Sequence, residues 1–349
     1  MLYPLENHKL LQHLPLVLDW LKDKPIKPIT VEISPSSNCN HRCLMCGYDY
    51  LGHTRGVMPG DSLVRISHEL AEYGVKGIVF AGDGEPFLNP ALLDAIIVAK
   101  KSGADVAISS NGILLFQKHL STIVENLTWF RFSVNGVGDS YAKVHNCKKD
   151  QYKIALNKIQ ALVGEKRKQD SSLTIGVQMV LLPENIDDAL ILAKTVKDIG
   201  VDYFVMKPFY FNKNNQYGHN FSLDYNNYLD YFDEIERLST NDFYCKMRLE
   251  TLENKDRNYH KCLGWPFILY VRSDGELMPC LAHQGNESLS LGSLLKKSFF
   301  DLWTGDRKKQ IIEIMEGINV QNCQPNCRHH NINQFLWEIS QNIPHKNFI

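Results

Sequence analysis

The 349-residue sequence lacks a long apolar run, an excess of either charge and any low-complexity tract. Its first 24 residues mix charged side chains such as Glu6, Lys9 and Asp19 among the apolar ones, which excludes the apolar core of a signal peptide. No later stretch is apolar for long enough to cross a bilayer. We therefore expect a soluble, cytoplasmic protein that has no membrane partner.

Charge is almost balanced, with 38 Lys and Arg residues against 39 Asp and Glu residues. The basic runs Lys166–Lys168 and Arg307–Lys309 are only three residues long and are typical of solvated helix faces. Because a nucleic-acid partner requires a broad basic surface, we expect none.

Cysteine is the residue type whose placement is informative. A chain without a secretory signal that carries nine cysteines favours metal or redox chemistry over disulfides, since the cytosol keeps thiols reduced. Three cysteines lie close together near the start and four lie in the last quarter, while Cys147 and Cys245 stand apart.

The first two thirds of the chain alternate short β-branched or aromatic runs with helix-period segments, which predicts βα units and a parallel sheet. Glycines such as Gly74, Gly103 and Gly200 close several of the helices. The predicted strands are Thr30–Ser34, Gly77–Ala81, Ala104–Ser109, Trp129–Val134, Leu173–Leu181 and Tyr203–Lys207. The predicted helices are Ser62–Glu72, Pro90–Ser102, Phe116–Glu125, Tyr152–Lys168 and Ile186–Ile199. The fold class is therefore α/β, a partial (βα)6 barrel of the TIM type.

The pattern divides the chain into four segments. We expect an N-terminal helical lead-in over residues 1–28, the barrel over 29–210, a connecting segment that lines the substrate site over 211–260, and a small C-terminal domain over 261–349. Within the last segment, Asp274-Gly275 predicts the turn of a hairpin spanning Phe267–Pro279.

Cys39, Cys43 and Cys46 form a C-x3-C-x2-C motif directly after the first predicted strand. Three thiolates this close together can bind one face of a [4Fe–4S] cluster and leave its fourth iron without a protein ligand. The alternative is a zinc knuckle, which needs a fourth ligand such as His41.

This motif resembles the signature of the radical S-adenosylmethionine (SAM) superfamily, at the position where that family places it. The resemblance implies that SAM binds the open iron and is cleaved to a 5′-deoxyadenosyl radical. It also implies an electron donor such as flavodoxin or ferredoxin. The residue before the last cysteine is usually aromatic in the family and is Met45 here, where we expect its thioether to pack near the adenine.

Polar residues follow the predicted strands, at the face where a (βα) barrel carries its chemistry. Gly82-Asp83-Gly84-Glu85-Pro86 is similar to the family's GGEP segment, with Asp83 in place of a glycine, and the resemblance implies that Gly84 and Glu85 bind the ammonium group of SAM. The resemblance also implies SAM contacts for Ser110, Asn111, Ser133, Asn135 and, in strand five, Gln178. Turns without a ligand remain the alternative for the serine and asparagine pairs.

Lys207 ends the sixth predicted strand and is followed by proline. We expect its side chain to point into the barrel mouth and to bind a phosphate or carboxylate, or to act as a base if desolvation lowers its pKa. A surface lysine is the alternative.

Cys262, Cys280, Cys323 and Cys327 form a second set, which the hairpin can bring together. Four thiolates can fully ligate a second [4Fe–4S] cluster or a structural zinc ion. The spacing resembles the truncated SPASM, or Twitch, extension of radical SAM enzymes, particularly that of an aminocyclitol dehydrogenase of the family. The resemblance implies an auxiliary [4Fe–4S] cluster that accepts or relays an electron.

These features predict an oxidoreductase that dehydrogenates an alcohol of a small polyol, sugar or aminocyclitol-like substrate. A radical epimerase is an alternative, because Cys245 or Cys147 can supply a hydrogen atom. A peptide-modifying maturase is another, disfavoured because the barrel begins near residue 29 and leaves no room for a separate peptide-recognition domain. A non-enzymatic zinc protein is the distant alternative.

Overall fold

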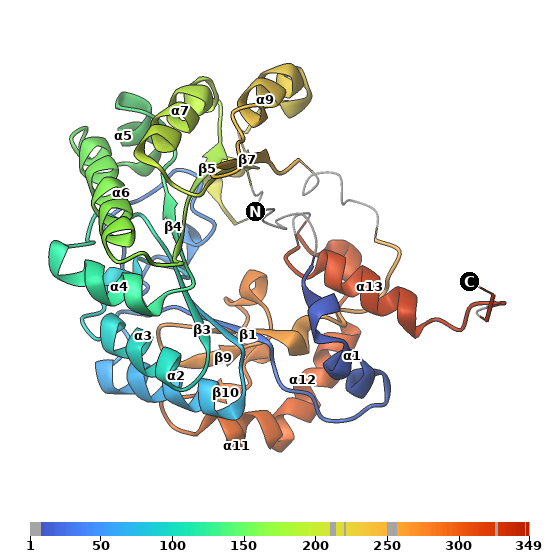
Figure 1. Cartoon of the computed structure of the whole chain (residues 1–349). Helices are drawn as coiled ribbons and strands as arrows, with labels where there is room; N and C mark the ends of the chain where they lie inside the picture. Colours follow the sequence, from blue (N-terminus) through green and yellow to red (C-terminus); the bar gives the residue numbers. More distant parts are fainter. Residues whose placement is uncertain are drawn as a thin grey trace.

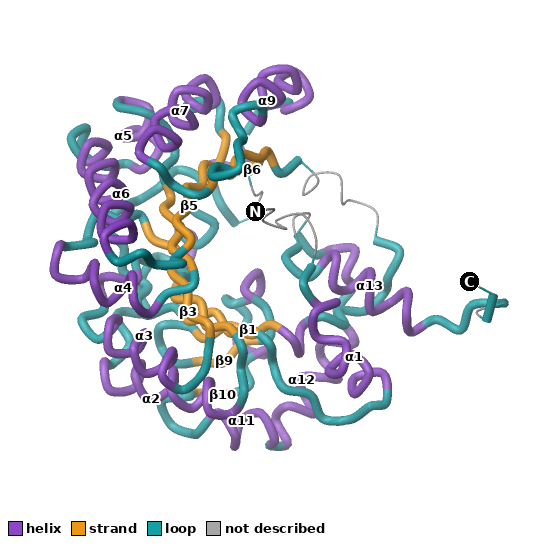
Figure 2. Tube along the Cα trace, in the orientation of Figure 1, coloured by secondary structure: helices purple, strands orange, loops and turns teal. Residues whose placement is uncertain are grey.

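The computed structural model of the chain describes residues 8–209, 214–219, 221–249, 257–324, 327–345 and 347–348. Its centre is a parallel sheet that confirms the predicted partial barrel. The six predicted strands are β1 (Thr30–Ile33), β2 (Gly77–Phe80), β3 (Asp105–Ser110), β4 (Trp129–Ser133), β5 (Thr174–Leu181) and β6 (Tyr203–Pro208). Each pairs in parallel with the next along the chain. Figure 2 shows the strands as an arc around the centre of the molecule.

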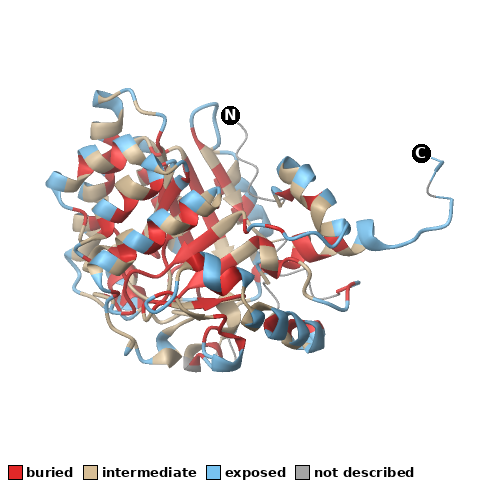
Figure 3. Ribbon diagram, turned by 90° about the horizontal axis from the view of Figure 1, so that it is seen from below, coloured by how far each residue is buried: buried red, intermediate tan, exposed pale blue. Residues whose placement is uncertain are grey.

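Helices cover the outer side of this arc (Figure 1). They are α2 (Gly60–Tyr73), α3 (Leu92–Lys101), α4 (Leu120–Asn126), α5 (Asp139–His145), α6 (Gln151–Lys168), α7 (Ala189–Ile199) and α9 (Leu229–Glu236). Alternate strand residues such as Ile78, Phe80, Val177 and Met179 are fully buried against these helices. Figure 3 shows the buried residues on the sheet and on the inner helix faces. The remaining strand residues therefore face the barrel lumen, because side chains alternate along a strand.

The sheet extends beyond the six predicted strands at both edges. Strand β7 (Tyr244–Met247) pairs in parallel with β6, and β8 (Ile268–Val271) pairs in parallel with β1. Strands β9 (Glu276–Met278) and β10 (Gly292–Ser293) continue from β8 in antiparallel fashion, which gives ten strands over the described residues. The β8–β9 pair confirms the predicted hairpin. The C-terminal region is therefore continuous with the barrel sheet.

The N-terminal lead-in packs on the C-terminal region. Helix α1 (Leu14–Leu21) and its flanks form an apolar cluster with α13 (His330–Ser340) and the start of β8, through Val17, Phe267 and Leu336 among others. Trp303, on α11 (Phe299–Thr304), donates its indole N–H to the carbonyl of Ile26 at 3.0 Å. Helix α12 (Asp306–Gly317) completes this region.

The connecting segment predicted over 211–260 contributes α8 (Gln216–His219), α9 and β7, and its residues 211–213, 220 and 250–256 lie outside the described ranges. Across the part of the chain that the structure describes, no helix combines the length and apolar character needed to cross a bilayer.

Candidate active site

The loop that carries Cys39, Cys43 and Cys46 lies across the end of α5. The backbone N–H of Leu44 donates to the carbonyl of Val144 at 2.9 Å, and the side-chain amide of Asn215 donates to the carbonyl of Cys46 at 2.7 Å. All three cysteines are free thiols of intermediate exposure.

The environment of these three thiols fits an iron–sulfur cluster. Burial is the main cause that raises their pKa values, to about 12 for Cys39, and nearby cysteines raise the pKa of Cys39 and Cys43 further. Sulfurs that raise one another's pKa lie close together, and in such surroundings they become thiolates by binding a cation. The three residues can therefore hold the predicted cluster.

Glu85 connects the turns that follow β2 and β3. Its carboxylate accepts hydrogen bonds from the Ser110 hydroxyl at 2.7 Å, the Asn111 backbone at 3.0 Å and the Phe87 backbone at 3.2 Å. The side chain is buried, and this burial raises the pKa of Glu85. The structure thus brings three of the predicted SAM contacts together.

Gly84 lies against the backbone that leads into the first cysteine. A Cβ atom at this position would meet the carbonyl oxygens of Ser36 and Asn38 at 2.3 Å each, so only glycine fits here. Asp83, the departure from the family segment, is buried and accepts a hydrogen bond from Tyr270 of β8 at 3.2 Å. Asp83 also pairs with Arg55 at 3.3 Å. Its carboxylate therefore fastens the β2 turn to the neighbouring strand.

Ser110 and Asn111 also form the local turns that the sequence allowed as an alternative. The backbone of Gly112 donates to the Ser110 hydroxyl at 2.8 Å, and that of Ile113 donates to the Asn111 side chain at 3.0 Å. The Asn111 amide additionally donates to Asn40, within the cysteine loop, at 2.8 Å. These side chains therefore brace the cysteine loop as well as their own turn.

Ser133 and Gln178 are register partners on the lumen face of β4 and β5. The Gln178 side-chain oxygen is buried and lacks a hydrogen-bond partner among the described residues. A buried polar atom is normally paired, so this oxygen fits a site that receives a donor from a ligand such as the ribose hydroxyls of SAM. Met45 packs beside Val180 and Phe209 at the ends of β5 and β6, where an adenine would find apolar contact.

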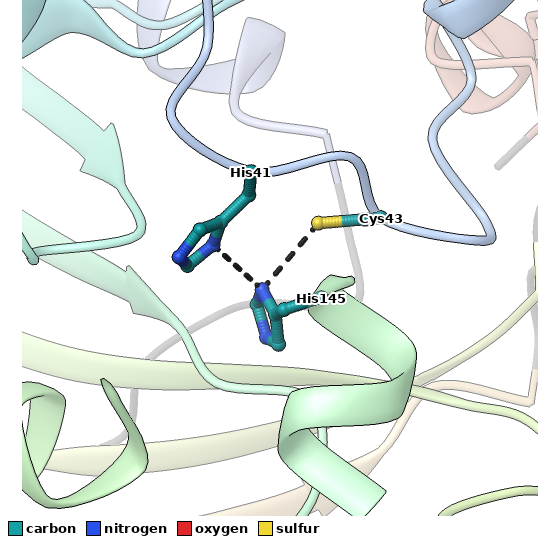
Figure 4. A group of neighbouring side chains, drawn as sticks. All are labelled: His41, Cys43 and His145. Carbon is teal, nitrogen blue, oxygen red and sulfur yellow. Dashed lines mark hydrogen bonds between the residues drawn. The ribbon is translucent and has the colours of Figure 1, made fainter. Parts of the chain in front are cut away.

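Two buried histidines at this site were not predicted as a functional pair. Figure 4 shows His145, at the end of α5, between His41 and Cys43. The Nδ1 atoms of the two histidines are 3.1 Å apart, and Cys43 Sγ is 3.4 Å from His145 Nδ1. Burial lowers the pKa of both histidines, that of His145 well below its usual value. Burial therefore favours the neutral form of both imidazoles.

Asn135 belongs to the same network, although it was predicted as a SAM contact. Its backbone N–H donates to His145 Nε2 at 3.0 Å, and its side-chain oxygen accepts from the Val180 backbone at 2.7 Å. The only sequence signal for this network is a histidine on the apolar face of α5, next to Tyr141 and Val144. Nothing in the spacing links that position to His41.

The zinc alternative named His41 as the fourth ligand of a knuckle. His41, Cys43 and His145 do have ligand atoms within 4.8 Å of one another. However, both Nε2 atoms are occupied by protein partners and the two Nδ1 atoms face each other at hydrogen-bonding distance. The geometry is that of a hydrogen-bonded pair.

The three remaining candidate residues, Lys207, Cys245 and Cys147, lie in different parts of the structure. Lys207 is half-buried and shares the lumen face of β6 with Tyr203 and Val205. Cys245 is 1% exposed and lies in the core between the sheet and its covering helices, on the side of β7 that faces away from the lumen. This placement keeps the Cys245 thiol on the opposite side of the sheet from the lumen, and its hydrogen-donor role stays a prediction. Cys147 lies near the first cysteine set, and burial raises its pKa to about 11.

The second cysteine set converges on one site between η10 (Val320–Asn322), the β8–β9 hairpin and α13. Burial raises the pKa of all four thiols, and Cys280 and Cys327 raise the pKa of Cys262 further. All four are free thiols, so the site can hold a fully ligated cluster. Two residues of the loop between its last two members, 325 and 326, lie outside the described ranges.

Charged and polar side chains support this second site. The buried guanidinium of Arg257 donates to the carbonyls of Cys323 at 3.3 Å and of Gln324. His329 is buried with Nδ1 4.0 Å from Cys262 Sγ, and burial lowers its pKa to about 3. Arg328, next to Cys327, forms an ion pair at 2.6 Å with Glu32 on the lumen face of β1. The second cysteine set therefore lies beside the barrel lumen.

Comparison with family models matches two segments of the chain. The model of the Radical SAM superfamily matches residues 33–196, and that of the iron–sulfur cluster-binding SPASM domain matches residues 262–328. Each cysteine set lies within one matched segment.

Individual relatives cover most of the chain. A Pyrococcus furiosus protein named tungsten-containing aldehyde ferredoxin oxidoreductase cofactor-modifying protein is 26% identical over 305 residues, which is 81% of this chain and 82% of the relative. The structure of Streptococcus suis SuiB bound to S-adenosylmethionine superposes with a TM-score of 0.65 at 16% identity, over 87% of this chain and 72% of SuiB. That of anSMEcpe with AdoMet and a peptide gives 0.58 at 17% identity, over 88% of each chain. At these identities the two structures demonstrate a shared fold.

Proposed function

Because this chain belongs to the radical SAM superfamily and carries a C-terminal SPASM iron–sulfur domain, we propose that it dehydrogenates an alcohol of a small polyol, sugar or aminocyclitol-like molecule. The observation that supports this reaction is the ion pair between Arg328 and Glu32. This ion pair supports the proposal because it joins the residue next to Cys327 to the lumen face of β1, beside the space in which the substrate would bind.

The reaction requires a balanced removal of two hydrogens. When bound, the cluster at Cys39, Cys43 and Cys46 supplies the electron that cleaves SAM to methionine and a 5′-deoxyadenosyl radical, and an external flavodoxin or ferredoxin replaces that electron. Oxidation of the alcohol would then transfer one hydrogen atom from the carbinol carbon to the 5′-deoxyadenosyl carbon and the hydroxyl proton to a base. Cys262, Cys280, Cys323 and Cys327 would hold the cluster that could accept the one remaining electron.

The chain's own residues position these partners. Glu85, with the glycine before it, is placed to bind the SAM ammonium group, because its buried carboxylate lies beside the cysteine loop. The unpartnered oxygen of Gln178 is placed to accept a ribose hydroxyl, with Ser133 beside it. Lys207 is our candidate for the base or for an anionic contact, because it lies on the lumen face one residue before the end of β6.

The lumen also suggests which functional groups the substrate carries. Arg131, on the lumen face of β4, contacts the Ser109 hydroxyl at 3.3 Å and stacks over Trp129 at 5.3 Å. It has no carboxylate partner within the described ranges. A guanidinium in this setting favours a substrate with several hydroxyls or an anionic group.

A second candidate function comes from the relative that spans most of the chain. The Pyrococcus furiosus protein is named for modifying the cofactor of a tungsten-containing enzyme, so modification of an enzyme cofactor is the alternative that sequence similarity favours. Peptide modification is supported only by the shared fold with structures of SuiB and anSMEcpe, both of which have been solved with peptides. For an epimerase, the burial of Cys245 in the core favours Cys147 over Cys245 as the hydrogen donor.

Anaerobic purification followed by turnover tests the proposal. We expect a brown protein with about eight irons, four for each cluster. With a panel of polyols, sugars and aminocyclitols, one member should increase 5′-deoxyadenosine formation and lose two mass units. An unchanged mass with one deuterium gained from heavy water would identify an epimerase, and stimulation only by a tungsten-enzyme cofactor or a peptide would overturn the small-molecule assignment. Colourless protein that contains zinc would reject the radical chemistry altogether.

A further inference from the structure

His145 is a buried residue at the candidate site for which the proposed reaction gives no role. It is 1% exposed, and its ring contacts a cluster cysteine, a second histidine and the turn after β4. Figure 4 shows the ring with its Nδ1 atom directed at both His41 and Cys43. The effect of His145 on the Cys43 sulfur depends on which ring nitrogen carries the proton. An N–H at Nδ1 would donate a hydrogen bond to the sulfur, whereas an unprotonated Nδ1 could only accept one.

The hydrogen-bond partners determine the tautomer. The backbone N–H of Asn135 can only donate, so His145 Nε2 is the acceptor and its single proton lies on Nδ1. The side-chain oxygen of Gln151 can only accept, and it lies 2.6 Å from His41 Nε2, so that atom carries the proton of His41. His41 Nδ1 is then a bare acceptor. One N–H therefore remains between the two rings and the sulfur, and it belongs to His145.

This N–H has two acceptors available. The first is His41 Nδ1 at 3.1 Å, and the second is Cys43 Sγ at 3.4 Å. When Cys43 is a thiol, the imidazole nitrogen is the stronger acceptor. When Cys43 is a thiolate bound to iron, the hydrogen bond to sulfur becomes charge-assisted and gains strength relative to the bond to nitrogen.

We propose that His145 is a positioning residue that donates a hydrogen bond to the Cys43 thiolate and thereby raises the reduction potential of the SAM-binding cluster. Reduction adds one negative charge to the cluster and its thiolates, and an N–H directed at a thiolate stabilises that charge. Hydrogen bonds to cluster sulfurs are among the factors that set such potentials. The proposal rests on the assignment of Cys43 as a ligand of that cluster.

The surrounding structure holds the ring in this orientation. Asn135 contacts Nε2 from both its backbone and its side-chain amide, the latter at 3.2 Å, and its side-chain oxygen is fixed by Val180 of β5. Tyr141 stacks on the ring with centroids 4.1 Å apart. These contacts hold the imidazole with its Nδ1 atom directed at His41 and Cys43.

Two substitutions separate hydrogen bonding from packing. The Gln amide of His145→Gln reaches the Nε2 position and can accept from Asn135, but it leaves no donor beside Cys43. The shorter amide of His145→Asn reaches the Nδ1 position and can donate to the sulfur. We expect His145→Gln to make one-electron reduction about threefold less favourable, which is a shift of about 28 mV to more negative potential at about 59 mV per tenfold. His145→Asn should restore most of the wild-type value.

The measurement is a mediated redox titration of the enzyme with both clusters bound. The titration is monitored through the EPR signal that changes when SAM is added, which distinguishes the SAM-binding cluster from the auxiliary cluster. His68→Gln, a histidine on the exposed side of α2, is the matched control and should leave the potential unchanged. An unchanged potential in His145→Gln, or an equal shift in His145→Asn, would overturn the proposal.

A second measurement covers the case in which a variant fails to bind iron. In wild-type protein labelled with 15N-histidine, pulsed EPR of the SAM-perturbed signal should show a 15N coupling and an exchangeable proton that disappears in D2O. Absence of both in protein with full iron content would overturn the proposal. Failure of the wild-type protein to bind iron or to respond to SAM would instead contradict the cluster assignment itself.

Discussion

The two cysteine sets are built by different means. The first has its three members within eight consecutive residues, in a loop held by polar groups from the ends of β2, β3 and α5. The second gathers four members from distant parts of the C-terminal region, with Arg257 binding the carbonyls of its loop. In the proposed function, the local motif supplies three ligands and leaves one iron open to SAM, whereas tertiary structure supplies four ligands and closes the second site. Under that proposal, the difference separates radical generation from electron acceptance.

The largest expected effect comes from breaking the first set. Cys43→Ala should abolish 5′-deoxyadenosine formation and remove about four of about eight irons, because two thiolates do not retain the open cluster. The measurement is iron content with anaerobic SAM cleavage by dithionite. Cys147→Ala, a nearby cysteine outside the ligand set, is the control and should retain both. Full SAM cleavage by Cys43→Ala would show that the motif is assigned wrongly.

Breaking the second cysteine set should impair substrate oxidation while leaving SAM cleavage largely intact. Cys280→Ala should lose about four irons and lower substrate oxidation about 100-fold or more, while dithionite-driven SAM cleavage stays within a few fold of wild type. The readouts are product mass and 5′-deoxyadenosine measured in the same samples. If product formation survived without the second cluster, the electron would leave by another route and the comparison between the sets would fail.

The ion pair between the two regions should have an intermediate effect. Arg328→Gln leaves the buried Glu32 carboxylate without its partner, which should cost about 1–3 kcal/mol of the free energy of unfolding. We also expect turnover to fall about tenfold, because the site of the second cluster shifts relative to the lumen. The control is Arg65→Gln, whose side chain is equally exposed at 41% and pairs with Glu69 outside the barrel. Equal effects from both variants would show that the pair is ordinary surface structure.

The raised pKa values of the thiols predict how pH acts on protein without iron. Burial raises the pKa of Cys39 and of Cys280 from 9.0 to about 12. Above pH 9 the native apo-protein holds protons that the unfolded chain has lost, so its stability falls as pH rises, by about 1 kcal/mol per thiol between pH 9 and 10. Urea unfolding of apo-protein at pH 8 and pH 10 measures this slope. Cys39→Ala should make the slope shallower, and a stability that rises with pH would contradict the burial of these thiols.

The smallest effect is expected from the cysteine in the barrel core. Cys245 faces the helices, so Cys245→Ala should cost about 1 kcal/mol in stability and change turnover less than twofold. The assay is product formation in heavy water, compared with wild type. Loss of activity together with loss of deuterium incorporation would restore Cys245 as a hydrogen donor and favour the epimerase.

The sequence predicted the six barrel strands within about one residue because each is a β-branched or aromatic run, and the first five are followed by a helix-period segment. It did not predict that β8 lies beside β1, since the two strands are more than 200 residues apart and no local pattern encodes their pairing. It also did not predict the orientation of Cys245, because the expected sheet ended at β6.

In the candidate site, too, the residues that belong to recognisable sequence motifs were predicted, and those that depend on long-range contacts were not. Cys39, Cys43, Cys46 and Glu85 were predicted because their motifs are local, whereas the second cysteine set was predicted because its spacing resembles that of a known extension. His145 was not, because its meaning depends on a contact with His41 across 104 residues of chain. Asn135 was predicted as a SAM contact, which stays a prediction, and the structure adds a partner that the sequence did not indicate: its backbone and side-chain amide bind His145.

The pairing of β8 with β1 has a consequence for electron transfer. Four register pairs of backbone join the strand that precedes the first cysteine loop to the strand that begins the hairpin of the second set. The strands that lead into the two cysteine sets therefore cannot separate without breaking a ladder of buried hydrogen bonds. If both sets hold clusters as proposed, the spacing between the two clusters is set by one continuous sheet rather than by a domain hinge.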